Sequence, residues 1–320
     1  MRAFVTGGAG FIGSHVVDRL LADGATVTIY DNLSTGFREF LDDARLRPGF
    51  TLIEGDLLDT ERLKRALPGH DVVFHFAANA DVRFGLDQPR QDLEQNTIGT
   101  FNVLDAMRSA EVRRIVFSST GSVYGEPHVF PTPETAPFPI QTSLYGASKV
   151  AAEGLITAHC EGFGFQAWIF RFVSILGERY THGHVFDFVK ALLADPHHLP
   201  ILGDGRQRKS YLHVGDCVEA ILTALAGADG RVNVFNLGTE EYCTVDDSAG
   251  WICEHLGVKP ERLYSGGQRG WVGDSPFIFL DCSRIQTLGW KPKLSIRDGI
   301  LRTVDFLMSH RWLLERAARR

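Results

Sequence analysis

The sequence predicts an α/β protein built on a doubly wound parallel sheet, with a smaller C-terminal α/β lobe. Over the first half of the 320-residue chain, apolar runs typical of strands alternate with longer amphipathic runs typical of helices. This alternation indicates a parallel sheet with helices on both faces. In addition, the first strand-like run passes directly into a glycine-rich turn, which an amphipathic run follows. A strand, turn and helix in this order are typical of sheets that bind nucleotides.

The strands expected in the large sheet are residues 2–6, 25–30, 50–53, 71–76, 112–118 and 166–171. The helical patterns between them include residues 57–67, 92–110 and 145–161. After about residue 174 the pattern is less regular, with loops at 177–183, 195–205 and 264–276 and helices near 184–194, 215–226 and 245–256. We therefore predict one domain at residues 1–173 and a lobe at 174–320, with a strand near 231–237 that returns to the large sheet.

The glycine-rich turn predicts a Rossmann-like dinucleotide site. Gly7 permits the tight turn, Gly10 lets the backbone approach a pyrophosphate, and Gly13 lets the following helix pack against the strand. The helix N-terminus then offers free N–H groups to the phosphates. The second strand ends in Asp31, eighteen residues after Gly13, where a carboxylate binds both ribose hydroxyls and favours NAD over NADP. The alternatives are an ordinary strand-to-helix turn and a simple capping role for Asp31.

A second group of residues predicts redox chemistry at a substrate hydroxyl. Tyr145 and Lys149 are four residues apart and share one face of a helix. A nearby ammonium is expected to lower the phenol pKa, so that Tyr145 accepts the hydroxyl proton while hydride leaves for a nicotinamide. Thr120, at the end of its strand, is expected to hydrogen-bond the same oxygen. The alternative for this pair is a surface aromatic–lysine contact.

Together these motifs resemble the extended short-chain dehydrogenase/reductase family, and within it the NAD-dependent epimerase/dehydratase group that acts on nucleotide sugars. The resemblance covers nearly the whole chain and includes segments 31–36, 55–57, 75–78, 96–100 and 203–205. It implies that Asp56 and Leu57 flank the adenine and that Asn96 and Ser118 hold the nicotinamide side. The remaining NAD-binding residues that it implies are Phe11, Ile12, Asn32, Ser34, Thr35, Gly36, Phe76, Ala77, Ala78, Tyr145, Lys149 and Phe172.

The resemblance also narrows the reaction. Dehydratases of this family carry Asp-Glu directly after the catalytic Thr, and the decarboxylases carry a Glu in this stretch, whereas this chain has Gly121 and Ser122. Neither residue can act as a carboxylate acid or base. We therefore expect a nucleotide-sugar 4-epimerase, similar to the UDP-glucose 4-epimerases, with tightly bound NAD and a transient 4-keto sugar. The alternatives are a UDP-uronate epimerase, a decarboxylase, a dehydratase, a 4-ketoreductase or a non-catalytic NAD-binding regulator.

The second lobe departs from the family pattern at the positions that bind the substrate diphosphate. Ser174 and His184 stand where relatives carry Asn, and Lys209 and Trp271 stand where they carry Arg. We expect an Arg, a Lys and a His still to meet the diphosphate, with Trp271 either stacking on the substrate or packing in the core. The substrate-binding residues implied are Arg83, Ser122, Ser174, His184, Leu202, Lys209, Tyr211, Arg269, Trp271 and Asp274. Arg83 is equally consistent with a solvated helix start.

Composition excludes other classes of protein. The formal charge of −6 gives no basic footprint for nucleic acid, and no apolar run approaches the length of a membrane span. Five cysteines without a C-x-x-C pair indicate reduced thiols, and we expect a cytoplasmic protein. The histidines at 182, 184, 197 and 198 lack a metal-site signature, so loop or pocket roles are expected. From the family resemblance we expect a homodimer formed through helices near 92–110 and 145–161.

Overall fold

The computed structural model describes residues 1–80, 87–138 and 140–317. Its centre is a seven-stranded sheet in the order β11-β6-β5-β4-β1-β2-β3, with all neighbouring strands parallel. This confirms the doubly wound, Rossmann-like fold. The strand bounds are β1 Arg2–Thr6, β2 Thr26–Asp31, β3 Phe50–Glu54, β4 Val72–His75, β5 Arg114–Thr120, β6 Gln166–Phe172 and β11 Val232–Leu237.

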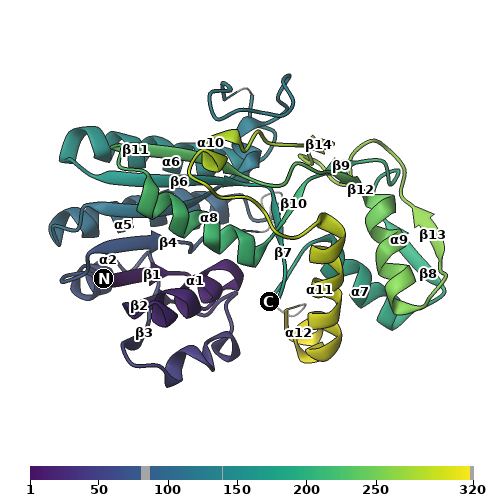
Figure 1. The fold of residues 1–320 in the computed structure, drawn as a ribbon, viewed down its shortest axis with the longest axis horizontal. Helices are drawn as coiled ribbons and strands as arrows, with labels where there is room; N and C mark the ends of the chain where they lie inside the picture. The colour runs from purple at the N-terminus through teal and green to yellow at the C-terminus, as the bar shows by residue number, and fades with distance from the viewer. Residues whose placement is uncertain (81–86, 139, 318–320) are drawn as a thin grey trace.

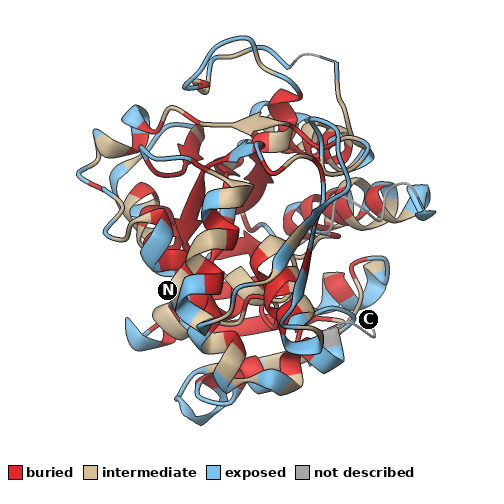
Figure 2. Ribbon diagram, turned by 90° about the vertical axis from the view of Figure 1, so that its right-hand side faces the viewer, coloured by how far each residue is buried: buried red, intermediate tan, exposed pale blue. Residues whose placement is uncertain are grey.

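Helices cover both faces of this sheet (Figure 1). Apolar residues of α1 (Phe11–Ala22) and α8 (Val214–Gly227) form one buried cluster with the strands, and those of α2 (Thr60–Ala66), α5 (Gly99–Ser109) and α6 (Leu144–Phe163) form another. Figure 2 shows the strands as a buried layer and the outer sides of the helices as exposed. The sheet therefore has apolar contacts on both faces, as its nearly continuous apolar strands require.

The helix expected at 92–110 is not continuous. A short helix, α4 (Pro89–Asp92), leads into a π-helical segment (Leu93–Ile98), and α5 begins only at Gly99. A π-turn widens a helix by one residue and rotates the side chains that follow it. Here Asn96 lies in the π-helical segment and contacts the loop after β4 through Asn79. The sequence pattern gave no sign of this interruption because the apolar spacing continues across it.

The second lobe holds small sheets and its own core. β7 (Ser174–Leu176) pairs with β10 (Tyr211–His213), β8 (His198–Ile201) with β13 (Glu261–Tyr264), and β9 (Arg208–Lys209) lies between β12 (Cys243–Thr244) and β14 (Phe277–Ile278). Three helices, α7 (His184–Ala194), α9 (Val245–Leu256) and α11 (Ile296–Ser309), pack around them. Two further helices are α10 (Ser283–Gln286) and α12 (Arg311–Ala317). β8 lies inside the loop expected at 195–205.

The chain crosses between the two parts more than once. After α8 it returns to the large sheet, where β11 pairs in parallel with β6, from Val232 beside Ala167 to Leu237 beside Phe172. This is the position that the sequence suggested for a strand near 231–237. β11 lies beyond residue 173 in the sequence but completes the large sheet. The division into two domains at residue 173 therefore stays a prediction.

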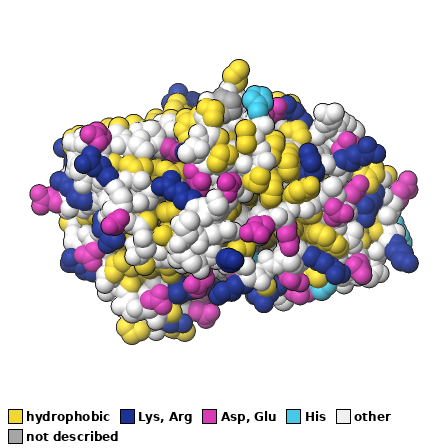
Figure 3. All heavy atoms as spheres, turned by 45° about the horizontal axis from the view of Figure 1, so that its top comes forward, with side chains coloured by type: hydrophobic (Ala, Val, Ile, Leu, Met, Phe, Trp, Pro, Cys, Tyr) yellow, Lys and Arg dark blue, Asp and Glu magenta, His cyan; other side chains and the backbone are white. Residues whose placement is uncertain are grey.

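On the face shown in Figure 3, lysine and arginine side chains lie among carboxylates and apolar patches. In the described part of the chain, no helix combines the length and apolar character that crossing a bilayer requires. All five cysteines are buried and unpaired.

Candidate functional site

The glycine turn after β1 is compact for steric reasons. Gly7 has φ +70°, and a Cβ on Gly13 would fall 2.1 Å from the carbonyl oxygen of Gly7. The start of α1 can therefore pack against the turn only without a side chain at Gly13. A Cβ on Gly10 would meet the Gly7 oxygen at 3.2 Å and nothing else within 4 Å, and Gly10 borders a cavity. A phosphate can therefore approach the backbone at the N-terminus of α1.

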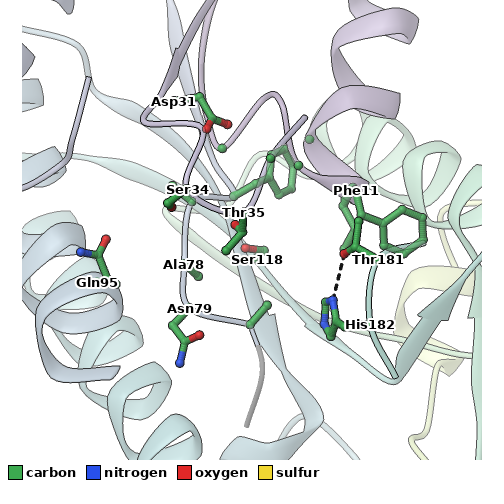
Figure 4. Close-up of a pocket in the computed structure, with 18 of the residues that line it drawn as sticks. Phe11, Asp31, Ser34, Thr35, Ala78, Asn79, Gln95, Ser118, Thr181 and His182 are labelled. Carbon is green, nitrogen blue, oxygen red and sulfur yellow. Dashed lines mark hydrogen bonds between the residues drawn. The ribbon is translucent and has the colours of Figure 1, made fainter. Parts of the chain in front are cut away.

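A first cavity of about 410 Å³ lies along the C-terminal ends of the strands. In Figure 4, Asp31 lies at one end of this cavity and Asn79 and His182 toward the other. The structure brings most of the predicted NAD-binding residues to its wall. Those that line it are Gly7, Gly10, Phe11, Ile12, Gly13, Asp31, Asn32, Ser34, Thr35, Gly36, Leu57, Phe76, Ala77, Ala78, Ser118, Tyr145, Lys149 and Phe172.

Asp31 is held in place by backbone amides. Its Oδ2 accepts a hydrogen bond from the N–H of Ala9 at 2.9 Å, and its Oδ1 accepts one from Leu33 at 2.8 Å. The side chain is buried, and it lines the cavity at the end of β2. Because each carboxylate oxygen can accept more than one hydrogen bond, Asp31 can also bind a pair of ribose hydroxyls. The same charge disfavours a phosphate at that position.

Two residues predicted to touch the cofactor do not line the cavity. Asp56 accepts hydrogen bonds from Asn32 Nδ2 at 2.7 Å and from the N–H of Leu58 at 2.8 Å, and so it fixes Asn32 at the wall. Asn96 is buried, and its amide exchanges hydrogen bonds with the backbone of Asn79 at 2.8 and 3.2 Å. In both cases the side chain is hydrogen-bonded to other protein groups, so these two residues support the cavity wall instead of forming it.

The predicted catalytic residues lie where β5 ends against α6. Lys149 is buried, and its Nζ donates a hydrogen bond to the carbonyl oxygen of Ser118 at 2.9 Å. Thr120 Oγ1 donates to Ser122 Oγ at 3.2 Å and accepts from the Ser122 N–H at 3.1 Å. Burial lowers the pKa of Lys149 to about 7, partly opposed by the carboxylates of Glu153 and Asp92. The lysine charge is therefore sensitive to its surroundings near neutral pH.

The phenol of Tyr145 differs from the expectation. In the protein alone, burial raises the pKa of Tyr145 to about 12, although a hydrogen bond with Thr120 acts in the opposite direction. We expected the ammonium of Lys149 to lower this pKa, but the lysine is directed to the Ser118 carbonyl. The desolvation of the buried phenol is the largest influence on this pKa, and the Asp92 carboxylate acts in the same direction.

A second cavity of about 560 Å³ adjoins the first. Tyr145, Phe172 and His182 line both cavities. The structure therefore places Tyr145 where the two cavities meet. The predicted substrate residues that line the second cavity are Ser122, Ser174, His184, Leu202, Lys209, Tyr211, Trp271 and Asp274. Thr120 lines it too.

The Lys, His and Arg expected to meet a diphosphate interact with other protein groups in this structure. Lys209 is paired with Asp274, with its Nζ 2.6 Å from Oδ1, and both side chains are buried. His184 Nε2 lies 2.7 Å from Ser248 Oγ, and burial lowers its pKa to about 3, so the ring is neutral at pH 7. Arg269 does not line the cavity and pairs with Glu126. Arg83 lies outside the described residues.

Trp271 is half-buried in the wall of the second cavity, with Lys209 Nζ 5.9 Å from its ring centroid. This position fits stacking on a ligand better than a place in the core. Sequence reasoning missed the wall residues Asn79, Gln95, Thr181, Asp187 and Gln207. Thr181 and Asp187 belong to the loop after β7 and the first turns of α7, at the carboxyl edge of a strand, where ligands gather in such folds.

Known proteins resemble this chain over its length. Residues 3–238 match the model of the NAD dependent epimerase/dehydratase family. A UDP-glucose 4-epimerase of Mycolicibacterium smegmatis is 36% identical over 315 residues, which cover 96% of this chain and 98% of that protein.

Two solved structures show the same fold. A UDP-galactose 4-epimerase has a TM-score of 0.88 and 38% identity, covering 98% of this chain and 100% of that one. A dTDP-glucose 4,6-dehydratase of Streptomyces venezuelae with bound NAD has a TM-score of 0.91 and 29% identity, covering 99% and 100%. The glycine turn, the Asp31 carboxylate and the first cavity fit the cofactor of these relatives. The chain therefore belongs to the NAD-dependent epimerase/dehydratase family, and its cofactor is NAD.

Proposed function

We propose that this protein is a nucleotide-sugar 4-epimerase, an isomerase that keeps its NAD bound through the cycle. The observation that carries the proposal is the end of β5, where Gly121 and Ser122 follow Thr120. A Cβ on Gly121 would lie 3.2 Å from the carbonyl oxygen of Phe172, so this position has little room for an acidic side chain. The site thus offers groups for oxidation at a hydroxyl without an adjacent acid for elimination.

The roles of the residues follow from where they lie. NAD, when bound, supplies the hydride acceptor and then the hydride donor. Tyr145 accepts the proton of the sugar hydroxyl and later returns it, and Thr120 hydrogen-bonds the same oxygen. A positive charge on the bound cofactor near Tyr145 would lower the phenol pKa from the value near 12 that burial imposes. Lys149 holds the strand end through Ser118 and adds its charge to the same side of the cavity.

A nucleotide-diphosphate sugar fits the second cavity in size and in its mixed lining of aromatic, hydroxyl and charged side chains. Trp271 and Leu202 supply apolar surface for a base, while Ser122 and Ser174 supply hydroxyls. The Asp274 carboxylate balances the charge of Lys209. Diphosphate binding therefore depends more on hydrogen bonds in this protein than in relatives with two arginines. The UDP-sugar enzymes among the relatives make UDP the first carrier to test.

The test is turnover of several nucleotide sugars without added cofactor, with the C4 epimer identified by NMR. We expect UDP-glucose and UDP-galactose to interconvert. Tyr145→Phe is expected to lower kcat by about 100- to 10,000-fold while NAD stays bound. Tyr264→Phe, an exposed tyrosine on β13, is the matched control and should leave kcat unchanged. Unchanged turnover in Tyr145→Phe would exclude the mechanism.

The second candidate function is a 4,6-dehydratase or decarboxylase, which Asp187 favours. This carboxylate in the first turn of α7 lines both cavities and is therefore a possible acid or base from outside the β5 segment. A dehydratase releases a 4-keto-6-deoxy sugar and a decarboxylase releases CO₂, so product analysis separates them from an epimerase. Asp187→Asn would abolish either of these activities and leave the proton transfer by Tyr145 intact.

We also propose that the protein forms a homodimer through α5 and α6. Phe101 on α5 is 46% exposed and Phe163 at the end of α6 is 48% exposed, which is unusual for large aromatic side chains. Leu93 and Ile98, in the segment that leads to α5, are exposed as well. Sedimentation at increasing concentration measures the oligomer, and Phe101→Glu is expected to shift it toward the monomer. A monomer at all concentrations would exclude this proposal.

A further inference from the structure

A buried ion pair lies directly behind the predicted catalytic residues. Arg171 on β6 donates from Nε to Glu153 Oε1 at 3.0 Å and from Nη2 to Glu153 Oε2 at 2.7 Å. The two side chains are only 6% and 5% exposed. Such a two-pronged pair fixes direction as well as distance. Moving two charges out of water costs free energy, which offsets much of the attraction between them. A buried pair of this kind is therefore weak evidence that its only role is to stabilise the fold.

The pair connects the helix of Tyr145 and Lys149 to the strand of Thr120. Glu153 lies one turn after Lys149 on α6 and accepts a hydrogen bond from Ser119 Oγ on β5. Lys149 holds the carbonyl of the neighbouring Ser118. Two successive residues of β5, directly before Thr120, are thus held by two side chains from one face of α6. A shift of either side chain would move Thr120 relative to Tyr145.

Arg171 extends this connection across the sheet. It lies beside Ser119 in the pairing of β5 with β6, and its Nη1 donates to the hydroxyl of Tyr124 at 2.8 Å. Tyr124 in turn donates to Asn236 Oδ1 on β11 at 2.8 Å. The carboxyl ends of β5, β6 and β11 are therefore joined by side chains. Neither Arg171 nor Glu153 lines either cavity, so the pair does not contact the ligands that we place there.

We propose that the Glu153–Arg171 pair is a positioning unit for the reaction: it fixes the end of β5 against α6 and places a carboxylate one turn from Lys149. The inference rests on the proposed redox role of Lys149 and Tyr145. The carboxylates of Glu153 and Asp92 act on Lys149, Asp92 acts on Tyr145, and Lys149 acts in turn on the buried ring of His75. The carboxylate of Glu153 is the first of the two that favour the ammonium form of Lys149.

The two variants are expected to differ in their effect on Lys149. Glu153→Gln removes the carboxylate that favours the ammonium form of Lys149 and leaves the Arg171 cation without its partner. The ammonium is then disfavoured, and the pKa of Lys149 falls. In Glu153→Gln/Arg171→Gln both charges are absent, so the potential at Lys149 returns toward that of the wild type. The double variant also avoids an uncompensated buried charge and guards against simple failure to fold.

The test compares wild type, Glu153→Gln, the double variant and the control Glu161→Gln, all loaded with NAD. Glu161 lies on the same helix but is 82% exposed and pairs with Arg231 at the surface. Carbon-13 NMR of lysines labelled at Cε, with the spectrum of Lys149→Met used to assign the signal, gives the pKa of Lys149. Steady-state kinetics with the preferred nucleotide sugar gives kcat and KM, and circular dichroism checks the fold.

We expect Glu153→Gln to lower the pKa of Lys149 and to reduce kcat about 10- to 100-fold, with KM within about twofold of wild type. The double variant should regain the wild-type titration but not the full kcat, because the two hydrogen bonds from Arg171 that orient the side chain of residue 153 are lost. Titration and kcat equal to those of Glu161→Gln would overturn the proposal, as would a loss of melting temperature alone. If no nucleotide sugar reacts with the wild type, the proposed function fails, and the titration still decides the role of the pair.

Discussion

The two cavities of this protein are built by different means. The first takes its shape from backbone: glycines at the turn after β1, amides that hold Asp31, and the ends of parallel strands. The second is shaped by side-chain pairs between distant segments, such as Lys209 with Asp274, 65 residues apart, and His184 with Ser248, 64 apart. A cavity shaped by backbone is specified by short stretches of sequence. In a cavity shaped by side-chain pairs, the polar and charged groups already have protein partners before a ligand binds. The predictions below test that contrast.

The largest effect is expected from breaking the buried pair in the second cavity. Lys209→Met leaves the Asp274 carboxylate buried without its cation and should cost about 3–5 kcal/mol of the free energy of unfolding. Lys209→Met/Asp274→Asn should recover most of this loss. Arg231→Met, which removes an exposed pair, should change stability by less than about 1 kcal/mol. Denaturant unfolding measures all three.

If Lys209→Met is as stable as the wild type and loses only affinity for UDP, the lysine is a ligand-binding cation. The contrast between the cavities would then be wrong.

The next effect concerns the backbone of the first cavity. The nearest atoms to a Cβ at Gly13 are backbone atoms of Gly7 and Gly8, at 2.1 to 3.0 Å, which cannot move aside as a flexible side chain could. Gly13→Ala should therefore cost about 1–3 kcal/mol or more and weaken NAD at least about tenfold. Gly162→Ala, on α6 with nothing within 4 Å of the added carbon, should be neutral or stabilising by up to about 1 kcal/mol. Calorimetry gives both quantities, and NAD affinity unchanged in Gly13→Ala would contradict the steric account.

Each region also holds a buried neutral histidine. His75 lies 2.7 Å from Thr6 Oγ1 and 2.9 Å from Thr100 Oγ1. Burial lowers the pKa of His75 to about 3 and that of His184 to about 3. Because the folded pKa lies below the unfolded value of about 6.5, the unfolded chain binds more protons between these limits, and stability falls as pH falls below about 6.5.

Each of these histidines should cost about 2 kcal/mol at pH 5 relative to pH 7. Replacing either by Gln should reduce the slope of unfolding free energy against pH by about one proton over this range. Urea unfolding from pH 7 to pH 5 measures the slope. A slope that stays the same in His184→Gln would show that this ring is already charged in the folded protein, and thus that the second cavity holds a cation.

The smallest effect is expected in cofactor choice. Asp31→Asn keeps the size of the side chain but removes the charge, and its amide nitrogen cannot accept the hydrogen bond of Ala9 or Leu33. We expect NAD affinity to fall about tenfold and the preference for NAD over NADP to shrink, because a 2′-phosphate is no longer repelled. Fluorescence titration with both dinucleotides gives the ratio. If the preference for NAD over NADP stays the same, a residue other than Asp31 discriminates between the two dinucleotides.

The sequence predicted the parts of this molecule that depend on local pattern. The strands around the glycine turn, the end of β2 at Asp31 and the helix that carries Tyr145 and Lys149 all follow from short-range spacing. The π-helical segment at Leu93–Ile98 did not, since it depends on contacts that Asn96 makes with Asn79. The pairing of Lys209 with Asp274 could not be seen either, because its partners meet only in the folded lobe. Likewise the raised pKa of Tyr145 arises from burial, which spacing does not reveal.

The return of β11 to the large sheet has a consequence for how the protein is made. A chain released from the ribosome only as far as Phe172 carries β6 with an open edge, because β11 is still about sixty residues away. That edge includes Arg171, whose neighbours Tyr124 and Asn236 meet only when β11 has arrived. Synthesis must therefore pass through the first part of the second lobe before the sheet can close. A fragment that ends at residue 173 would expose the edge of β6, which is prone to aggregation. The predicted boundary between the two lobes is therefore not a boundary between units that fold independently.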